Sequence, residues 1–138
     1  MNELEQRIHA EIAEKGGIPF SRFMERALYE PGLGYYETQR EVGRSGDFYT
    51  SVSVGSLYGE LLAFQFADWL AEIDGPVQLV EAGAHDGRLA KDVLTYLRDW
   101  RPELFKRCEL ILWEPSKIHR QWQGSVLAEF VDKVKWVA

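Results

Sequence analysis

Apolar residues in the first half of the chain recur at the spacing of α-helices. Leu4, Ile8 and Ile12 follow one another every four residues, and they predict a helix that is capped by Asn2 and ends at the glycines at 16–17. A second helical stretch begins after Pro19 and ends in the turn at 31–34. A third helix, capped by Ser53 or Ser56, is expected to run to about Ile73.

The second half alternates short apolar runs with helical patterns. Residues 77–82, 108–113 and 134–137 read as buried strands. Residues 88–100 and 117 to about 130 read as the helices between them. This order predicts a parallel sheet with right-handed crossovers, as in an α/β Rossmann-like fold.

The pattern divides the chain at the break formed by Asp74, Gly75 and Pro76. Residues 1–74 are expected to form a helical N-terminal layer. Its irregular segment at 35–53 is expected to be a functional cap loop, because long irregular loops in compact domains are often functional. Residues 75–138 are expected to form the first half of a cofactor-binding domain.

Charge and composition limit the classes of binding partner and the cellular location that we expect. The net charge is −6, and no Lys/Arg cluster stands out, so nucleic acid is not an expected partner. No apolar run reaches the length of a membrane span, and neither a secretory nor a transit signal is recognisable at the N-terminus. The single cysteine, Cys108, excludes an internal disulfide and favours a reducing compartment, so we expect a cytoplasmic protein. The three histidines show no ligand spacing, and no metal site is expected.

The turn after the first strand carries the candidate chemistry. A dinucleotide fingerprint beginning at Gly83 would need glycines where His85 and Arg88 stand, so NAD and FAD are disfavoured. S-Adenosylmethionine has no pyrophosphate, and three of the four positions of an acidic-x-G-x-G-x-G pattern are matched by Glu81, Gly83 and Gly87, with His85 at the middle glycine.

A second carboxylate follows the second strand. Glu114 stands where an acidic residue of this fold accepts hydrogen bonds from the ribose hydroxyls. The alternative interpretation is an ordinary strand-to-helix turn, with Glu81 and Glu114 as surface carboxylates.

Four sequence blocks resemble the MidA-like family of S-adenosylmethionine-dependent methyltransferases, which includes a mitochondrial protein arginine methyltransferase. The blocks lie at residues 18–36, 43–51, 79–89 and 114–116. The resemblance implies a Rossmann-like class I methyltransferase fold that binds S-adenosylmethionine and methylates a protein acceptor. It also implies that Glu81, Gly83 and Gly87 line the cofactor and that Glu114 holds its ribose.

The same resemblance implies that a loop with Asp47, Thr50 and Ser51 folds over the cleft and contacts the cofactor. Asp47 is the candidate catalytic residue, binding the cofactor's amino group or a basic substrate. Its alternative role is an Asx-turn that orders its own loop.

Members of the family are usually more than twice as long, so we expect a truncated parallel sheet that lacks the later strands. An open sheet edge and apolar face would then favour a homodimer or another covering partner. The alternative function is therefore a non-catalytic module that binds cofactor or a protein.

Overall fold

The computed structural model describes residues 1–39, 46 and 49–138. Three parallel strands form a sheet in the order β1 (Val77–Ala82), β2 (Cys108–Trp113) and β3 (Val134–Val137). Each crossover contains helices, as parallel pairing requires. The predicted parallel α/β fold and its three strand positions are confirmed.

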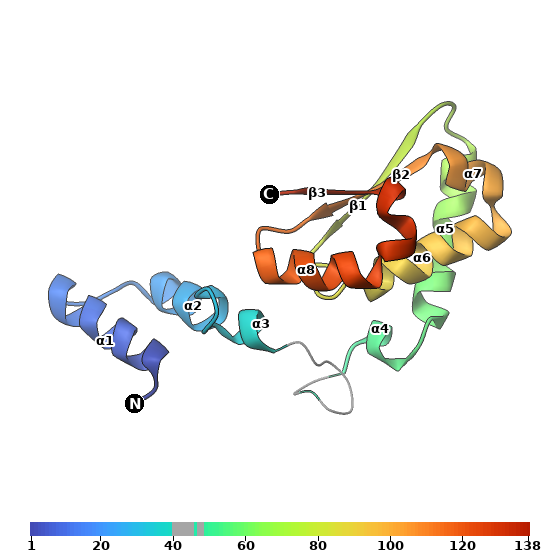
Figure 1. Cartoon of the computed structure of the whole chain (residues 1–138). Coiled ribbons are helices and arrows are strands. Elements are labelled where there is room, and N and C mark those ends of the chain that lie inside the picture. Colours follow the sequence, from blue (N-terminus) through green and yellow to red (C-terminus); the bar gives the residue numbers. More distant parts are fainter. Residues whose placement is uncertain (40–45, 47–48) are drawn as a thin grey trace.

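Two helices cover one face of this sheet. Helix α6 (Arg88–Trp100) links β1 to β2, and α8 (Lys117–Val126) links β2 to β3; both lie on the same side of the strands (Figure 1). The alternating burial of the strands follows from this arrangement, because successive side chains point to opposite faces. The buried residues of the covered face are Val77, Cys108, Leu110, Leu112 and Val134.

The other face of the sheet is open in the described part of the chain. Val80 on β1 is 67% exposed and Trp113 on β2 is 52% exposed. Polar residues cross the same face, where Glu109 accepts a hydrogen bond from Gln78 at 2.9 Å and pairs with Lys135 at 2.5 Å. The apolar run of β1 is therefore covered on one side only, although the sequence predicted a buried strand.

Helix α5 (Leu57–Ala71) packs against α6 through small residues. Gly59, Ala63 and Ala67 are buried, and a Cβ atom on Gly59 would lie 2.5 Å from the Cβ of Asp92. Ser56 precedes α5 but makes no side-chain cap, and its backbone is already α-helical; its hydroxyl donates to Glu60 at 2.6 Å.

Short elements complete this part of the fold and correct two expectations. Helix α4 (Ser51–Val54) precedes α5, and α7 (Pro102–Arg107) was not predicted as a helix of its own. Helix α8 ends at Val126 rather than near residue 130, because a 3₁₀ helix, η1 (Ala128–Lys133), follows it.

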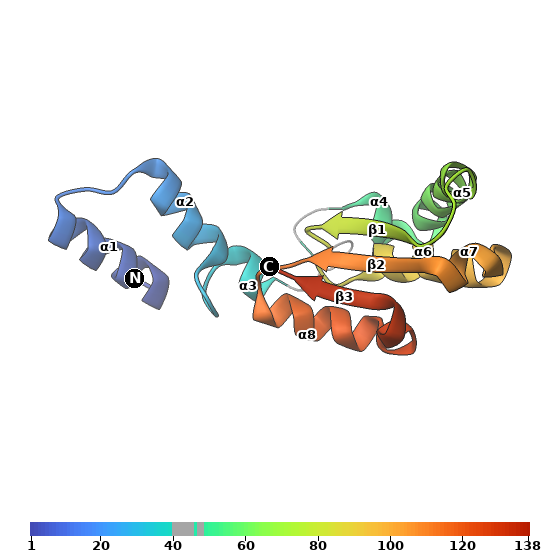
Figure 2. The same cartoon turned by 90° about the horizontal axis from the view of Figure 1, so that it is seen from above.

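The first helices lie away from the sheet. Helices α1 (Glu3–Lys15) and α2 (Phe20–Tyr29) lie beyond α3 (Tyr35–Thr38), and the carboxyl ends of the strands point toward α3 (Figure 2). Helices α1 and α2 therefore do not cover the sheet, and the division of the chain at residue 74 stays a prediction. The N-cap that the sequence predicted for the first helix is confirmed, because Asn2 forms a capping box with Glu5 at the start of α1. Within the described ranges, no helix is long and apolar enough to cross a membrane.

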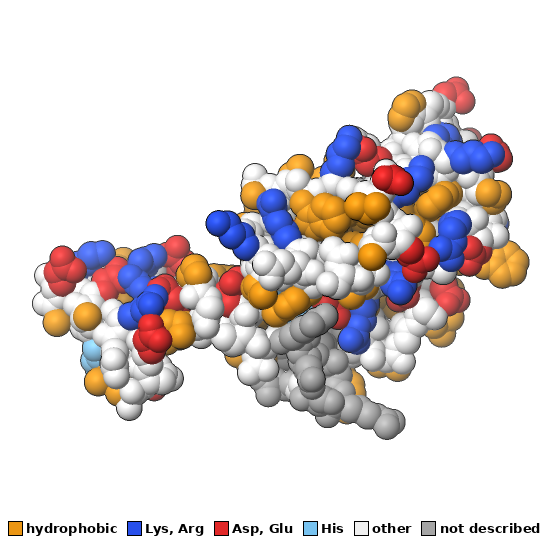
Figure 3. Space-filling view, viewed as in Figure 1, with side chains coloured by type: hydrophobic (Ala, Val, Ile, Leu, Met, Phe, Trp, Pro, Cys, Tyr) orange, Lys and Arg blue, Asp and Glu red, His pale blue; other side chains and the backbone are white. Residues whose placement is uncertain are grey.

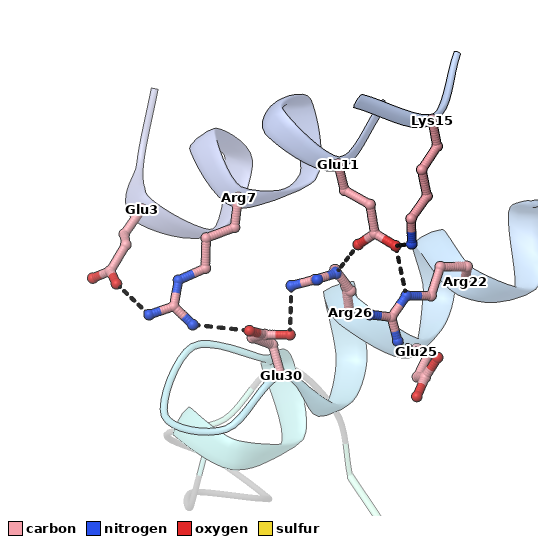
Figure 4. Close-up of polar contacts among 8 residues, drawn as sticks. All are labelled: Glu3, Arg7, Glu11, Lys15, Arg22, Glu25, Arg26 and Glu30. Carbon is pink, nitrogen blue, oxygen red and sulfur yellow. Dashed lines mark hydrogen bonds and ion pairs between the residues drawn. The ribbon is translucent and has the colours of Figure 1, made fainter. Parts of the chain in front are cut away.

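Ion pairs join α1 to α2. Acidic and basic side chains lie side by side over these helices (Figure 3). The Glu11 carboxylate is only 7% exposed and contacts three cations, with Lys15 at 2.8 Å, Arg22 at 3.1 Å and Arg26 at 2.5 Å (Figure 4). Hydrogen bonds from Lys15 and Arg22 lower the pKa of Glu11 to about 2. Glu30 extends the network by pairing with Arg26 at 3.0 Å.

Candidate functional site

The turn after β1 contains backbone conformations that favour glycine. Gly83 has φ +73° and Gly87 has φ +86°, and the Gly87 N–H donates to the Ala84 carbonyl oxygen at 2.8 Å. No atom of the described residues lies within 4 Å of the position of a Cβ atom on Gly83, so the main chain there is open toward the part of the structure that is described. A Cβ atom on Gly87 would lie 3.2 Å from the Cδ1 of Leu127. Gly83 thus leaves room for a ligand, whereas Gly87 lets α8 pack closely against the turn.

His85 stands where the expected pattern has its middle glycine. It adopts φ +48°, a left-handed conformation that histidine tolerates better than most residues. Its Nε2 lies 3.1 Å from the carbonyl oxygen of Gln39, which follows α3. The substitution therefore keeps the glycine-like backbone and adds a contact to the N-terminal segment.

Glu81 lies near the end of β1 on the covered face. Its side chain is half-buried and makes no hydrogen bond to any described residue. Burial, together with the nearby charge of Asp86, raises the pKa of Glu81 to about 7. A carboxyl group in this state is suited to receive a cation or a hydrogen-bond donor from a ligand.

Glu114 follows β2 beside the glycine turn. Ala82 pairs with Trp113 in the sheet, so Gly83 and Glu114 are the next positions on adjacent strands. The Glu114 residue is only 4% exposed. Its Oε1 accepts a hydrogen bond from the Ser116 N–H at 2.9 Å. The structure thus brings Glu81, Gly83 and Glu114 to the same carboxyl edge of the sheet, where ligands of open α/β folds bind.

Helix α8 supplies polar residues that the sequence analysis missed. Gln123 is fully buried, and its amide donates to Glu114 Oε2 and to the His85 carbonyl oxygen, each at 3.0 Å. Its Oε1 accepts from Trp136 Nε1 at 2.9 Å. His119 lies one turn earlier, with Nδ1 3.2 Å from Glu114 Oε2. The spacing of these two polar residues places them on one helix face, a pattern that could have revealed them.

The described loop residues Thr50 and Ser51 lie at the start of α4. Thr50 caps α4, since its hydroxyl accepts from the Ser53 N–H at 3.2 Å. Neither Thr50 nor Ser51 makes a hydrogen bond to Glu81, Glu114 or the glycine turn in the described structure. Asp47 lies outside the described residues. The binding roles of these three residues stay predictions.

Metal ligands do not gather in the part of the chain that the structure describes. No group of three or more His, Cys, Asp or Glu residues there is arranged to hold a metal ion.

Comparison with known proteins identifies the family. A family model described as "Putative S-adenosyl-L-methionine-dependent methyltransferase" matches residues 61–138, more than half of the chain. The chain belongs to this methyltransferase family. The MidA-like resemblance is thereby confirmed at the level of the family.

A solved structure shares the fold. A "likely methyl transferase" from Burkholderia thailandensis, bound to S-adenosyl-homocysteine, matches with a TM-score of 0.74 and 33% identity over 97% of this chain and 36% of its own. The expected Rossmann-like class I methyltransferase fold with a helical N-terminal part is therefore confirmed.

Curated relatives are much longer than the chain. The mitochondrial protein arginine methyltransferase NDUFAF7 homolog of Drosophila melanogaster is 34% identical over 102 residues, which cover 72% of this chain and 23% of the relative. Protein arginine methyltransferase NDUFAF7 of Mus musculus is 39% identical over 85 residues, covering 60% of this chain and 20% of the relative. The chain thus spans about a quarter or less of these proteins.

Proposed function

We propose that this chain binds S-adenosylmethionine and serves as the cofactor-binding part of a methyltransferase. The observation that carries the proposal is the juxtaposition of Glu81, Gly83 and Glu114 at one edge of the sheet. These residues fit the cofactor, because Glu81 is an unpartnered half-buried carboxyl among the described residues and Gly83 borders open space.

Each residue has a distinct role in this proposal. Glu81 binds the ammonium group of the methionine moiety, which favours its ionised form. Gly83 lets the ligand approach the main chain. Glu114 accepts hydrogen bonds from the ribose hydroxyls. The cofactor supplies an activated methyl group on a sulfonium, so the protein contributes mainly by orienting it toward the acceptor.

A protein arginine side chain is the proposed methyl acceptor. The relatives named protein arginine methyltransferases support this choice. Loss of a proton from the guanidinium accompanies its methylation, and Asp47 is the proposed group that binds or deprotonates the acceptor. The predicted cytoplasmic location stays a prediction.

The open sheet supports a second candidate function, that of a non-catalytic module. The exposed apolar side chains of Val80 and Trp113 are suited to cover by another protein surface, including that of a second copy. In that function the cofactor site would bind ligand without transferring a methyl group.

Isothermal titration calorimetry of the full 138-residue chain with S-adenosylmethionine and S-adenosyl-homocysteine tests the main proposal. We expect binding of both ligands and a loss of about tenfold or more in affinity in Glu114→Gln, because a charged acceptor is replaced by a neutral amide. Glu109→Gln is the matched control, since this carboxylate lies on the open face of β2, the strand that Glu114 follows. Absence of binding by the unmodified chain contradicts the proposal.

A further inference from the structure

His119 lies between two hydrogen-bond acceptors from different parts of the chain. Its Nδ1 is 3.2 Å from Glu114 Oε2, and its Nε2 is 2.6 Å from the carbonyl oxygen of Tyr36 in α3. A carbonyl oxygen has no proton to donate, so Nε2 must carry a hydrogen. An ionised Glu114 likewise needs a hydrogen on Nδ1. Only the imidazolium form of His119, which carries a hydrogen on each ring nitrogen, can make both contacts at once.

The surroundings of His119 are closely packed. The residue is 8% exposed, and its ring centroid lies 4.9 Å from that of Trp122 and 5.6 Å from that of His85. Among the described residues, two titratable side chains contact it, Glu114 after β2 and His85 in the glycine turn, whereas α3 contributes the main-chain carbonyl of Tyr36.

Three donors fix the Glu114 carboxylate. The Ser116 N–H binds Oε1, while Gln123 Nε2 and His119 Nδ1 bind Oε2. Gln123 is itself held by the His85 carbonyl oxygen and by Trp136. His119 differs from the other two donors, because its second nitrogen reaches α3 and its hydrogen-bonding capacity changes with pH.

We propose that His119 is a positioning residue, which in its imidazolium form holds Glu114 for the cofactor and links this carboxylate to the main chain of α3. This inference rests on the proposed function and adds a residue and a pH dependence to it. When His119 loses a proton, it must give up either Glu114 or Tyr36. The contribution of His119 to the affinity for the nucleoside is therefore largest when His119 is protonated and falls as the pH rises.

Calorimetry with S-adenosyl-homocysteine across about pH 5.5 to 8.5, where imidazoles change charge, tests the inference. We expect His119→Leu to bind about tenfold more weakly than the unmodified chain at the acidic end, since it loses a charge-assisted hydrogen bond. We expect this difference to shrink toward the alkaline end. His119→Asn keeps a hydrogen-bond donor near the position of Nδ1 but has no titratable ring. It should therefore bind the ligand better than His119→Leu, and its affinity should depend on pH in the same way as that of His119→Leu.

His9→Asn is the matched control, because His9 is exposed on α1, and its profile should equal that of the unmodified chain. Glu81 titrates in the same range, but it is present in every variant and cancels in the affinity ratios. A constant ratio between the unmodified chain and His119→Leu at every pH overturns the inference while leaving the proposed function intact. Absence of binding by the unmodified chain instead overturns the proposed function.

Nitrogen-15 NMR of the histidine rings reads the arrangement without ligand. We expect His119 to carry protons on both ring nitrogens at the acidic end, with a shift toward a single tautomer in Glu114→Gln at the same pH. A neutral His119 ring at the acidic end of the unmodified chain overturns the positioning role, even if the Leu variant fails to fold.

Discussion

Gly87 and Leu127 pack so closely that a Cβ atom on the glycine would lie 3.2 Å from the leucine Cδ1. The glycine also has φ +86°, which an L-residue adopts only with strain. We expect Gly87→Ala to lower the free energy of unfolding by roughly 2 to 4 kcal/mol, because backbone strain and overpacking add. Urea denaturation followed by circular dichroism measures this change.

Gly83→Ala separates these two contributions. Gly83 has a similar φ of +73°, but no described residue lies within 4 Å of a Cβ atom there, so we expect the strain to act alone and the loss to be about 1 to 2 kcal/mol. Equal losses in the two variants would show that Leu127 yields to the added methyl group.

The raised pKa of Glu81 makes stability depend on pH. The value is about 7 in the fold and 4.5 for a free glutamate, so the folded state binds the proton more tightly. The contribution of the tighter proton binding to the free energy of unfolding is complete below pH 4.5 and is lost as the pH rises to about 7. We expect Glu81→Gln to remove this loss, and above pH 7 to be more stable than the unmodified chain by on the order of 2 kcal/mol.

Denaturant titrations of both proteins at a series of pH values test this sign. The difference between their unfolding free energies isolates Glu81 from other titrating groups. A difference that is the same at pH 5 and pH 8 would contradict the raised pKa.

Apolar spacing was sufficient to predict the strands and the helices between them. It worked for β1, β2 and β3 because the more buried side chains of each strand alternate with more exposed ones. It failed at the end of α8, where Phe130 stays buried although its backbone leaves the α-helical conformation. A buried apolar residue cannot distinguish an α-helix from a following 3₁₀ turn.

The site was predictable only where it depends on position along a strand. The common position of Glu81, Gly83 and Glu114 could be predicted because parallel strands end at one edge of the sheet. His119 and Gln123 were missed because they are polar residues on the buried face of α8, and hydrophobic periodicity assigns such residues to solvent. Their spacing of four residues puts them on one face of α8, but their contacts to Glu114 depend on how this helix packs against the sheet, which the spacing alone does not give.

The ion pairs of Glu11 should keep α1 attached to α2 well into the acidic range. The pKa of Glu11 is about 2 rather than 4.5, so the contribution of its carboxylate to the docking is present above pH 4.5 and is lost as the pH falls toward 2. We expect Glu11→Gln to speed amide hydrogen exchange across α1 at neutral pH, because three cations then lose their shared partner.

Glu14→Gln is the control for this exchange measurement. Glu14 is an exposed carboxylate of the same helix and makes no ion pair with the described residues. Faster exchange in both variants alike would assign the effect to helix charge rather than to docking.

The open sheet face predicts self-association of the chain. Val80 on β1 is 67% exposed, and β1 pairs with β2 alone among the described strands. Burying this face and edge against a second copy would remove apolar area from water and satisfy unpaired backbone groups. Light scattering coupled to size exclusion should therefore report a dimer, and Val80→Lys should weaken it by about tenfold or more, because a charge would be buried in the contact. Val131→Lys changes a valine that is 60% exposed on η1 and should leave the dimer intact. A monodisperse monomer throughout a concentration series would instead mean that this face stays in contact with water.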